Sequence, residues 1–198
     1  HLPIDSLDPW LDCRLTKAER HQVEKILEAR ISTRKPSCYL VKEAWIQGLS
    51  FYVDERVIVP RSFIGELLRN SLSAVVADPA DVRRALDLCT GSGCLAILAA
   101  HTFPEANIDA ADISDDALAV ARQNVGDYGL SERINVVASD VFMGLAGQRY
   151  DLILSNPPYV SDDAIAEALH DLPGLKKPDG SFDASQFQSV LRENGFDP

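Results

Sequence analysis

Apolar residues near the amino terminus recur at the spacing of one helical face. Four of them share this face: Val23, Ile26, Leu27 and Ile31. Just before them, Thr16-Lys-Ala-Glu19 has the sequence of a capping box, in which the threonine hydroxyl and the glutamate carboxylate each accept a bond from a free helix N–H. The pattern predicts a helix that starts at this box and ends before Pro36.

The next stretch has the pattern of two short strands. Leu49–Val53 and Arg56–Val59 are rich in apolar residues, and the polar pair Asp54-Glu55 separates them. A short polar turn between two such runs predicts a β-hairpin. After the interruption at 60–62, the spacing of apolar residues predicts another helix from Ile64 to Val76.

From Arg84 onward, strand-like and helix-like segments alternate. The predicted strands cover residues 85–88, 108–113, 134–138 and 151–154, and the predicted helices between them cover 95–101 and 115–125. This alternation predicts an α/β fold with a parallel sheet covered by helices. Beyond residue 160 the pattern identifies no central strand.

Composition agrees with a folded globular protein. The chain has 198 residues, of which 46% are hydrophobic, and no apolar run reaches the length of a spanning helix. The four cysteines lie at positions 13, 38, 89 and 94, without a CxxC spacing. We interpret them as reduced thiols of a cytoplasmic protein, in preference to a disulfide or zinc site. No ligand cluster for a metal is evident.

Charge is distributed unevenly along the chain. The formal net charge is −11, yet the segment from Arg14 to Lys42 carries eight Lys or Arg against three Glu, so the remainder carries −16. This balance argues against a general nucleic-acid binder. The basic segment is either a solvated helix face or one binding surface.

The first candidate ligand site is Asp87-Leu-Cys-Thr-Gly-Ser-Gly93, between a predicted strand and a predicted helix. Gly91 and Gly93 allow a sharp turn and a close approach of a ligand to the backbone, and the helix amino terminus then faces that ligand. A dinucleotide motif would have a third glycine where this chain has Ala96. A tight turn without a ligand is the alternative.

Two further carboxylates follow later strands. Asp112 ends the second strand, 19 residues after Gly93, where it could accept bonds from both hydroxyls of a ribose; alternatively it caps the next helix, a role for which Ser114 competes. Asp140 and Val141 follow the third strand and suit an adenine, which would stack on the apolar side chain, although a simple loop aspartate is also possible. Open α/β sheets bind ligands at these carboxyl ends.

The fourth candidate is Asn156-Pro-Pro-Tyr159, directly after the last predicted strand. Each proline restricts the preceding residue to extended geometry, so the carbonyls of this segment remain free to accept bonds. Together with the Asn156 side-chain oxygen and the Tyr159 ring, they form a socket for a flat group that carries an NH₂. An ordinary proline turn is the alternative.

With these four elements, the chain resembles the class I S-adenosylmethionine-dependent methyltransferases, whose [DN]PP[YF] signature is met by 156–159. It is most similar to the glutamine amide methyltransferases, which join a helical N-terminal domain to the cofactor domain through a β-hairpin. Pro60-Arg-Ser-Phe-Ile-Gly-Glu66 resembles the branch that modifies large-subunit ribosomal protein three, although Phe63 replaces a usual proline. Cys89 stands where the release-factor branch has glycine.

The resemblance implies a class I, Rossmann-like parallel sheet with a helical substrate-recognition domain over 1–43, a hairpin linker over 44–62 and the catalytic domain over 63–198, apparently truncated or discontinuous after about 160. It assigns S-adenosylmethionine, which leaves as S-adenosylhomocysteine, to Asp87, Cys89, Thr90, Gly91, Ser92, Gly93, Asp112, Asp140 and Val141. It assigns catalysis to Asn156, Pro157 and Tyr159, and substrate binding to these three together with Pro158 and Arg61.

The implied reaction is methyl transfer to the side-chain amide of a glutamine in that ribosomal protein, within an assembling large subunit or free. No membrane and no sequence-specific DNA are expected as partners. Three alternatives stay open: the glutamine of class 1 release factors, the exocyclic amine of adenine in DNA, and a scaffold that binds ribosomal proteins without catalysis.

Overall fold

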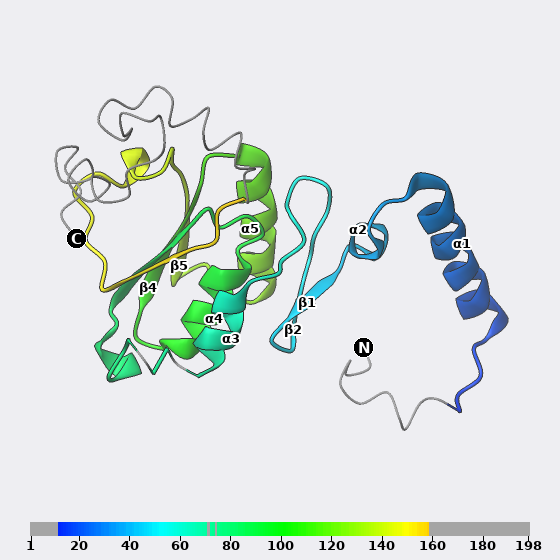
Figure 1. Cartoon of the computed structure of the whole chain (residues 1–198), viewed down its shortest axis with the longest axis horizontal. Coiled ribbons are helices and arrows are strands. Elements are labelled where there is room, and N and C mark those ends of the chain that lie inside the picture. The colour runs from blue at the N-terminus through cyan, green and yellow to red at the C-terminus, as the bar shows by residue number, and fades with distance from the viewer. Residues whose placement is uncertain (1–11, 71, 74, 159–198) are drawn as a thin grey trace, which may run out of the picture. The chain divides into compact units, whose positions relative to one another are not determined.

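Four parallel strands form the centre of the α/β part of the chain. The computed structural model describes residues 12–70, 72, 73 and 75–158. The strands are β3 (Arg84–Leu88), β4 (Asn107–Asp112), β5 (Ile134–Ala138) and β6 (Leu152–Ser155), and they pair in the order β5-β4-β3-β6 (Figure 1). The alternation of strands and helices therefore predicted the fold class correctly, and all four predicted strands are confirmed to within one residue at each end.

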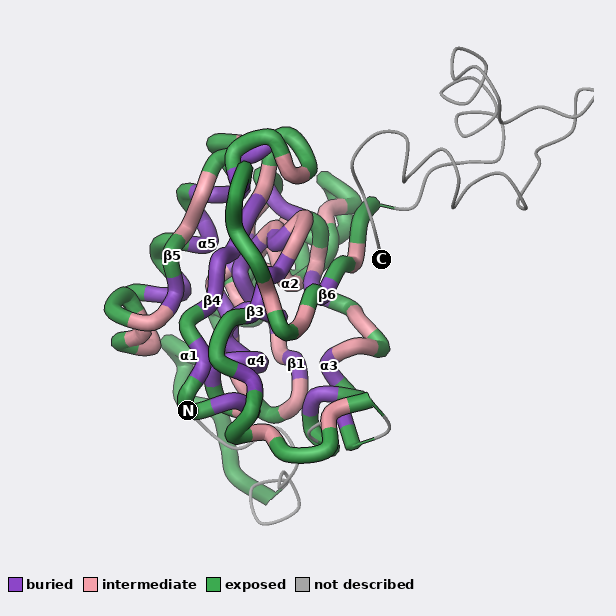
Figure 2. The backbone as a smooth tube through the Cα atoms, turned by 90° about the vertical axis from the view of Figure 1, so that its left-hand side faces the viewer, coloured by how far each residue is buried: buried purple, intermediate pink, exposed green. Residues whose placement is uncertain are grey.

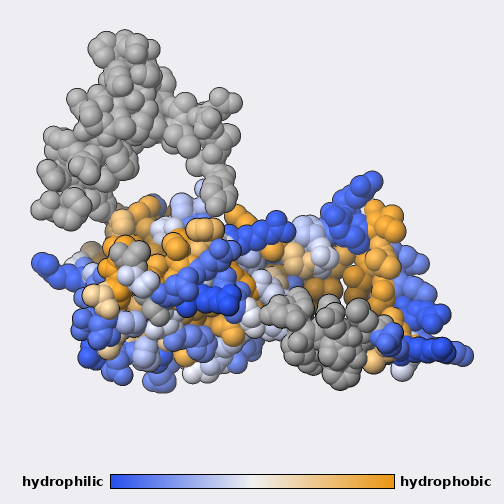
Figure 3. Space-filling model, turned by 60° about the horizontal axis from the view of Figure 1, so that its bottom comes forward, coloured by the Kyte–Doolittle hydropathy of each residue, from blue (hydrophilic) through white to orange (hydrophobic). Residues whose placement is uncertain are grey.

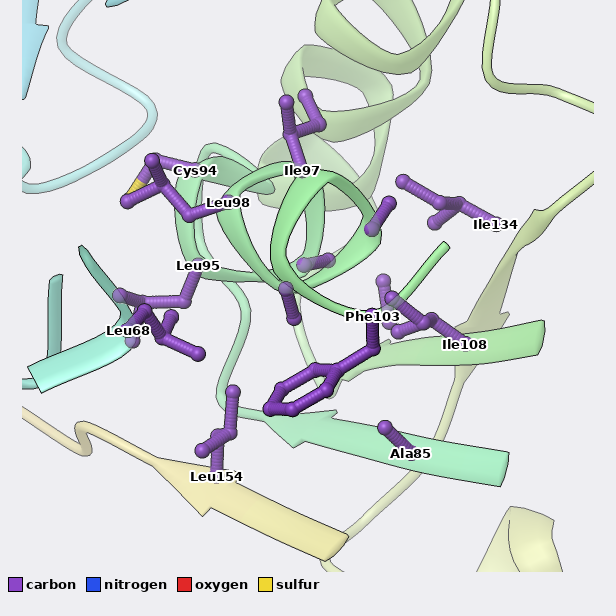
Figure 4. Close-up of a cluster of buried hydrophobic side chains, with 14 of the residues drawn as sticks. Leu68, Ala85, Cys94, Leu95, Ile97, Leu98, Phe103, Ile108, Ile134 and Leu154 are labelled. Atoms are coloured by element: carbon purple, nitrogen blue, oxygen red, sulfur yellow. The ribbon is translucent and has the colours of Figure 1, made fainter. Parts of the chain in front are cut away.

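One face of this sheet carries the main hydrophobic core. Residues of alternate strand positions, among them Ala85, Ile108, Ile134 and Leu154, pack against the helices α3 (Phe63–Arg69), α4 (Cys94–Thr102) and α5 (Asp115–Asp127) (Figure 4). The intervening positions form a second, smaller cluster on the other face. Because side chains alternate across a strand, the apolar residues of β3 and β4 contribute to both faces, and Figure 2 shows both strands as largely buried.

Helix α4 is held almost entirely by tertiary contacts. Seven of its nine residues are buried, and its N-cap, Gly93, provides no side-chain hydrogen bond. At its other end, the Arg133 guanidinium donates to the carbonyls of Ala100, Phe103 and Ala106 at 2.7–3.0 Å. These bonds satisfy carbonyl groups that a helix leaves free at its carboxyl end.

The amino-terminal helices are α1 (Lys17–Thr33) and α2 (Ser37–Val41). The predicted capping box is confirmed: the Thr16 side chain accepts from the Glu19 N–H, and the Glu19 carboxylate accepts from the Thr16 N–H at 2.8 Å. No residue of α1 is buried. Its apolar face is exposed, as the hydrophobic surface on this helix in Figure 3 also shows.

The predicted hairpin is in the wrong place. The strands that pair are β1 (Ala44–Ile46) and β2 (Leu49–Phe51), and their turn is Gln47-Gly48 with φ values of 51° and 80°. Positive φ at both turn residues matches the right-handed twist of the flanking strands. The polar pair Asp54-Glu55 does lie in a turn, closed by a bond from the Val57 N–H to the Asp54 carbonyl at 3.1 Å, but no strands pair across it.

The prediction for α3 is also wrong in its length. The helix ends at Arg69, with Asn70 as its C-cap, and the chain then turns at Leu72, whose φ is 49°. Two short 3₁₀ turns complete the described secondary structure, one at Pro79–Asp81 and one at Met143–Leu145.

The chain divides into two compact units, His1–Pro157 and Pro158–Pro198. Of the second unit only Pro158 lies within the described residues, so the expectation of a discontinuity after residue 160 falls outside them. The domain boundaries at residues 43 and 62 stay a prediction. Across the described parts of the chain, no helix has the length and apolar character to cross a bilayer.

Candidate functional site at the carboxyl edge of the sheet

The four predicted ligand elements lie along one edge of the sheet. Because the strands are parallel and pair in the order β5-β4-β3-β6, their carboxyl ends meet at the same edge. The order along that edge is Asp140, Asp112, the loop over 89–93, and Asn156. Neighbouring elements also contact one another: the Ser139 N–H donates to the Asp112 carbonyl at 2.9 Å, and the Ser155 hydroxyl donates to the Leu88 carbonyl at 3.1 Å.

The glycine loop has the conformation that its sequence predicted. Gly91 and Gly93 have φ values of 55° and 79°, and the Thr90 N–H donates to the Ala111 carbonyl of β4 at 3.0 Å. Cys89 has a φ of 62°, in the left-handed region that strains a residue with a Cβ. The resemblance had placed a glycine at this position in related proteins, and the conformation gives the physical reason.

Asp87 supports the loop from beneath. Its side chain is fully buried; its Oδ2 accepts from the Thr90 hydroxyl and, at 3.0 Å, from the Ala96 N–H, and its Oδ1 has no partner among the described residues. Burial raises the pKa of this carboxyl to about 7, against the lowering effect of the two hydrogen bonds. Thr90 and Ser92 are also buried.

The thiols of this loop are uncharged at neutral pH. Burial raises the pKa of Cys89, and the nearby carboxylates of Asp112 and Asp87 raise it further. Burial likewise raises the pKa of Cys94 to about 12. All four cysteines are free. Within the described ranges, no group of three or more His, Cys, Asp or Glu is arranged to hold a metal ion.

Asp112 is oriented by two backbone donors. Its Oδ2 accepts from the Gly91 N–H at 2.9 Å and its Oδ1 from the Ser114 N–H at 3.0 Å. Each oxygen therefore keeps a lone pair for a further donor. The N-cap of α5 is Ser114, whose hydroxyl accepts from the Ala117 N–H. The helix-cap alternative for Asp112 is therefore wrong, because Ser114 has this role.

Asp140 and Val141 lie on an exposed turn that the Ser139 side chain holds. The Ser139 hydroxyl donates to the Val141 carbonyl at 2.7 Å and accepts from the Gly144 N–H at 2.9 Å. Val141 has a φ of 46°, which is unusual for a β-branched residue. Strained backbone of this kind often accompanies a ligand site.

Sequence reasoning missed Ile113. It directly follows Asp112 and is 69% exposed, just as Val141 directly follows Asp140 and is 53% exposed. The signal was present in the sequence, since an aspartate followed by an aliphatic residue stands at the end of β4 and again two residues after the end of β5. Exposed aliphatic side chains beside these carboxylates offer apolar surface to a flat ring.

Asn156, Pro157 and Pro158 lie beyond the last strand in neither helix nor sheet, and they are half-buried, exposed and exposed respectively. The side chain of Asn156 makes no hydrogen bond to another described residue. Tyr159 lies outside the described residues. Arg61 is exposed and lies directly before the N-cap of α3.

The chain matches one protein family over most of this region. The model of the methyltransferase small domain matches residues 66–172, more than half of the chain, so the chain belongs to this family of methyltransferases. The parallel sheet in the order β5-β4-β3-β6, with the glycine loop after β3, is accordingly a class I methyltransferase core with a site for S-adenosylmethionine.

Similar curated proteins carry a more specific name. The chain is 53% identical over 174 residues to the ribosomal protein uL3 glutamine methyltransferase of Burkholderia pseudomallei, and the matched region covers 84% of this chain and 57% of that protein. It is 49% identical over 172 residues to the protein of the same name from Bradyrhizobium diazoefficiens, covering 84% and 54%. The chain thus spans little more than half the length of these relatives.

Among solved structures, the chain is similar to the human methyltransferase 10 domain containing protein. The two are 22% identical, with a TM-score of 0.49, over 75% of this chain and 79% of that one.

Proposed function

We propose that this chain carries the cofactor site and catalytic centre of an enzyme that methylates the side-chain amide nitrogen of a glutamine in ribosomal protein uL3. The observation that carries the proposal is the order of elements along the sheet edge. The loop over 89–93 lies between Asp112 on one side and Asn156 on the other, so a cofactor held by the first two would end beside the third.

The residues along β4 and β5 fit S-adenosylmethionine. Asp112 has one spare lone pair on each oxygen, as two vicinal ribose hydroxyls require. Ile113 and Val141 offer exposed apolar surface for the adenine, and Asp140 an acceptor for its amine. The positive φ values of the loop let its backbone approach the methionine end. When bound, S-adenosylmethionine supplies an electrophilic methyl group on a sulfonium sulfur.

The residues after β6 fit a primary amide as the acceptor. An amide nitrogen is a weak nucleophile because its lone pair is delocalised into the carbonyl. In our proposal the Asn156 side-chain oxygen and the Pro157 carbonyl each accept one N–H of the target amide, and the Tyr159 ring stacks on its plane. These bonds fix the nitrogen and match the positive charge that develops on it. The methylated nitrogen then loses its proton to water, so no strong base is required.

The choice of uL3 as substrate rests on the names of the relatives and on Pro60-Arg-Ser62, with Arg61 proposed to contact the substrate. Outside 14–42 the chain carries a formal charge of −16, which would attract a basic ribosomal protein. An assembling large subunit in the cytoplasm is the setting we propose. The same charge disfavours adenine in DNA as the acceptor, because base-flipping enzymes bind a polyanion.

The experiment uses the natural full-length protein with labelled S-adenosylmethionine. It is offered three substrates in parallel: uL3 from cells that lack this enzyme, a class 1 release factor, and adenine-containing duplex DNA. We expect label on uL3, and a mass increase of one methyl group on a glutamine by peptide mass spectrometry. Label on the release factor or on DNA alone would overturn the substrate assignment. Binding of uL3 without label would support the scaffold alternative.

Asn156→Asp sharpens the test of amide chemistry. The variant keeps an acceptor oxygen and adds a negative charge, which favours an amine that becomes cationic over a neutral amide. We expect methylation of uL3 to fall while any activity on adenine is kept or rises. The opposite pattern would contradict a neutral amide as the acceptor.

A further inference from the structure

The side chain of Asn124 joins two segments that are far apart in the sequence. Asn124 lies in α5 and is 1% exposed. Its Oδ1 accepts from the Tyr52 N–H at 2.8 Å, and its Nδ2 donates to the Tyr52 carbonyl at 3.0 Å and to the Ser92 carbonyl at 2.8 Å. Tyr52 follows β2, and Ser92 belongs to the loop over 89–93, which is called the cofactor loop below. One buried amide therefore bonds both segments.

The cofactor loop rests on α5 at a second point as well. A Cβ built on Gly93 would lie 3.3 Å from the Cα of Ala121, so this glycine packs directly on the helix backbone. Ala121 lies three residues before Asn124, on the same face of the helix. The loop is therefore in close contact with α5 at Gly93, and the Asn124 bond holds the carbonyl of the preceding residue, Ser92, to the same helix.

A second residue, Tyr128 at the C-cap of α5, also bonds the hairpin but makes no side-chain bond to the loop. The Tyr128 hydroxyl donates to the Ser50 carbonyl at 2.7 Å, and the Tyr128 ring packs against Phe51 with centroids 5.5 Å apart. Figure 1 shows the hairpin beside α5. Asn124 in α5 and Tyr128 at its C-cap thus both bond the chain at or directly after the hairpin, but of these two residues Asn124 is the one whose side chain also bonds the cofactor loop. This pair provides a matched comparison.

We propose that Asn124 is a positioning residue that couples the segment after β2 to the cofactor loop. Through this amide, the position of the hairpin sets the position of the Ser92 carbonyl, and cofactor binding in turn restrains the hairpin. Coupling between binding and a distant segment is reciprocal. The inference rests on the proposed cofactor site, and it adds a route by which residues amino-terminal to the hairpin influence cofactor affinity.

The test compares Asn124→Ala with Tyr128→Phe in the full-length protein. Both remove a bond between α5 and the hairpin, so both should lower Tm. Only Asn124→Ala should also weaken S-adenosylhomocysteine binding in calorimetry, by about tenfold, within the usual range for coupling between sites. Equal affinity in Asn124→Ala and the wild type, or equal losses in the two variants, would overturn the proposal.

Amide hydrogen exchange gives a readout that a merely structural role would not change. In the wild type, adding S-adenosylhomocysteine should slow exchange at the Tyr52 N–H, whereas in Asn124→Ala the same amide should not respond. The wild-type measurement tests the coupling even where the variant does not fold. An unchanged exchange rate at the Tyr52 N–H despite saturated binding would contradict the coupling. If the wild type binds no cofactor at all, the proposed function fails instead.

Discussion

The two halves of the sheet edge are held in opposite ways. In the half formed by β3 and β4, Asp87, Thr90 and Asp112 are buried or half-buried, and their side chains bond backbone or one another. In the half that follows β6, Asn156 makes no side-chain bond to a described residue, and Pro157 and Pro158 are exposed. The first half is shaped by tertiary contacts, whereas the second is shaped by the covalent restriction of two prolines.

In the proposed function, this difference corresponds to two tasks, cofactor binding and substrate binding. A site for a cofactor used in every cycle gains from a shape that exists before binding, because less ordering is then lost on binding. A site for a protein side chain has to leave its acceptors free until the target arrives. Substitutions in the two halves should therefore affect different steps, and four predictions test this separation.

The largest effect is expected from Asn156→Ala. The variant removes one acceptor for the target N–H, so turnover on uL3 should fall by a factor of about 10² or more, the scale of one well-placed group at a reacting centre. Cofactor affinity should stay nearly unchanged, because Asp112 and the loop are untouched. Single-turnover rates under saturating cofactor, together with calorimetry, measure both. A wild-type rate would remove Asn156 from the mechanism.

Asp112→Ala should produce the converse pattern. Loss of the acceptor for two ribose hydroxyls should weaken S-adenosylmethionine binding by about 1–3 kcal/mol. At saturating cofactor, turnover should recover most of its wild-type value. Asp116→Ala is a control, since that exposed residue lies in the first turn of α5. Calorimetric titration of both variants makes the comparison, and unchanged affinity in Asp112→Ala would place this residue outside the site.

Asp87 should make the free energy of unfolding depend on pH. Its pKa is raised from 3.8 to about 7 on folding, so between these values the folded state binds more protons than the unfolded state. The free energy of unfolding should therefore fall as pH rises through this window, by up to about 1.4 kcal/mol per pH unit. Asp87→Asn should remove this slope.

Urea unfolding at a series of pH values measures the difference between the wild type and Asp87→Asn. The carboxyls of Asp54 and Asp151 have lowered pKa values, so their contribution is lost only as pH falls below about 4. The two effects therefore occupy separate windows. Parallel curves for the two proteins from pH 4 to pH 7 would show that Asp87 is charged throughout.

The smallest effect is expected from the basic segment. If it contacts RNA on an assembling particle, Arg30→Glu with Arg34→Glu should reduce methylation of assembly intermediates severalfold more than methylation of free uL3. Lys35 is left unchanged because it pairs with Glu55 at 2.9 Å. Arg122→Glu with Arg149→Glu is a control of equal charge change. Equal losses on both substrates would favour the solvated-face interpretation.

Local sequence signals predicted the elements that depend on local physics. The capping box at Thr16, the turn at Gly91 and Gly93, and the strands of the sheet followed from side-chain chemistry and periodicity, because each needs only near neighbours in the chain. The hairpin was predicted in the wrong place because its local signal was misleading. Asp54-Glu55 is a turn, but Asp54 is bonded to Arg56 and Tyr52 instead of closing a hairpin.

Only the tertiary structure decided which side chains are buried and which distant segments they bond. The sequence predicts that Asp87 binds the cofactor, and the fold buries its side chain beneath the loop, where the Thr90 hydroxyl and the Ala96 N–H of α4 donate to it. The hydrogen bonds of the Asn124 side chain have no sequence signature at all. Its partners lie 72 and 32 residues away, and only the packing of α5 between the hairpin and the loop brings all three together.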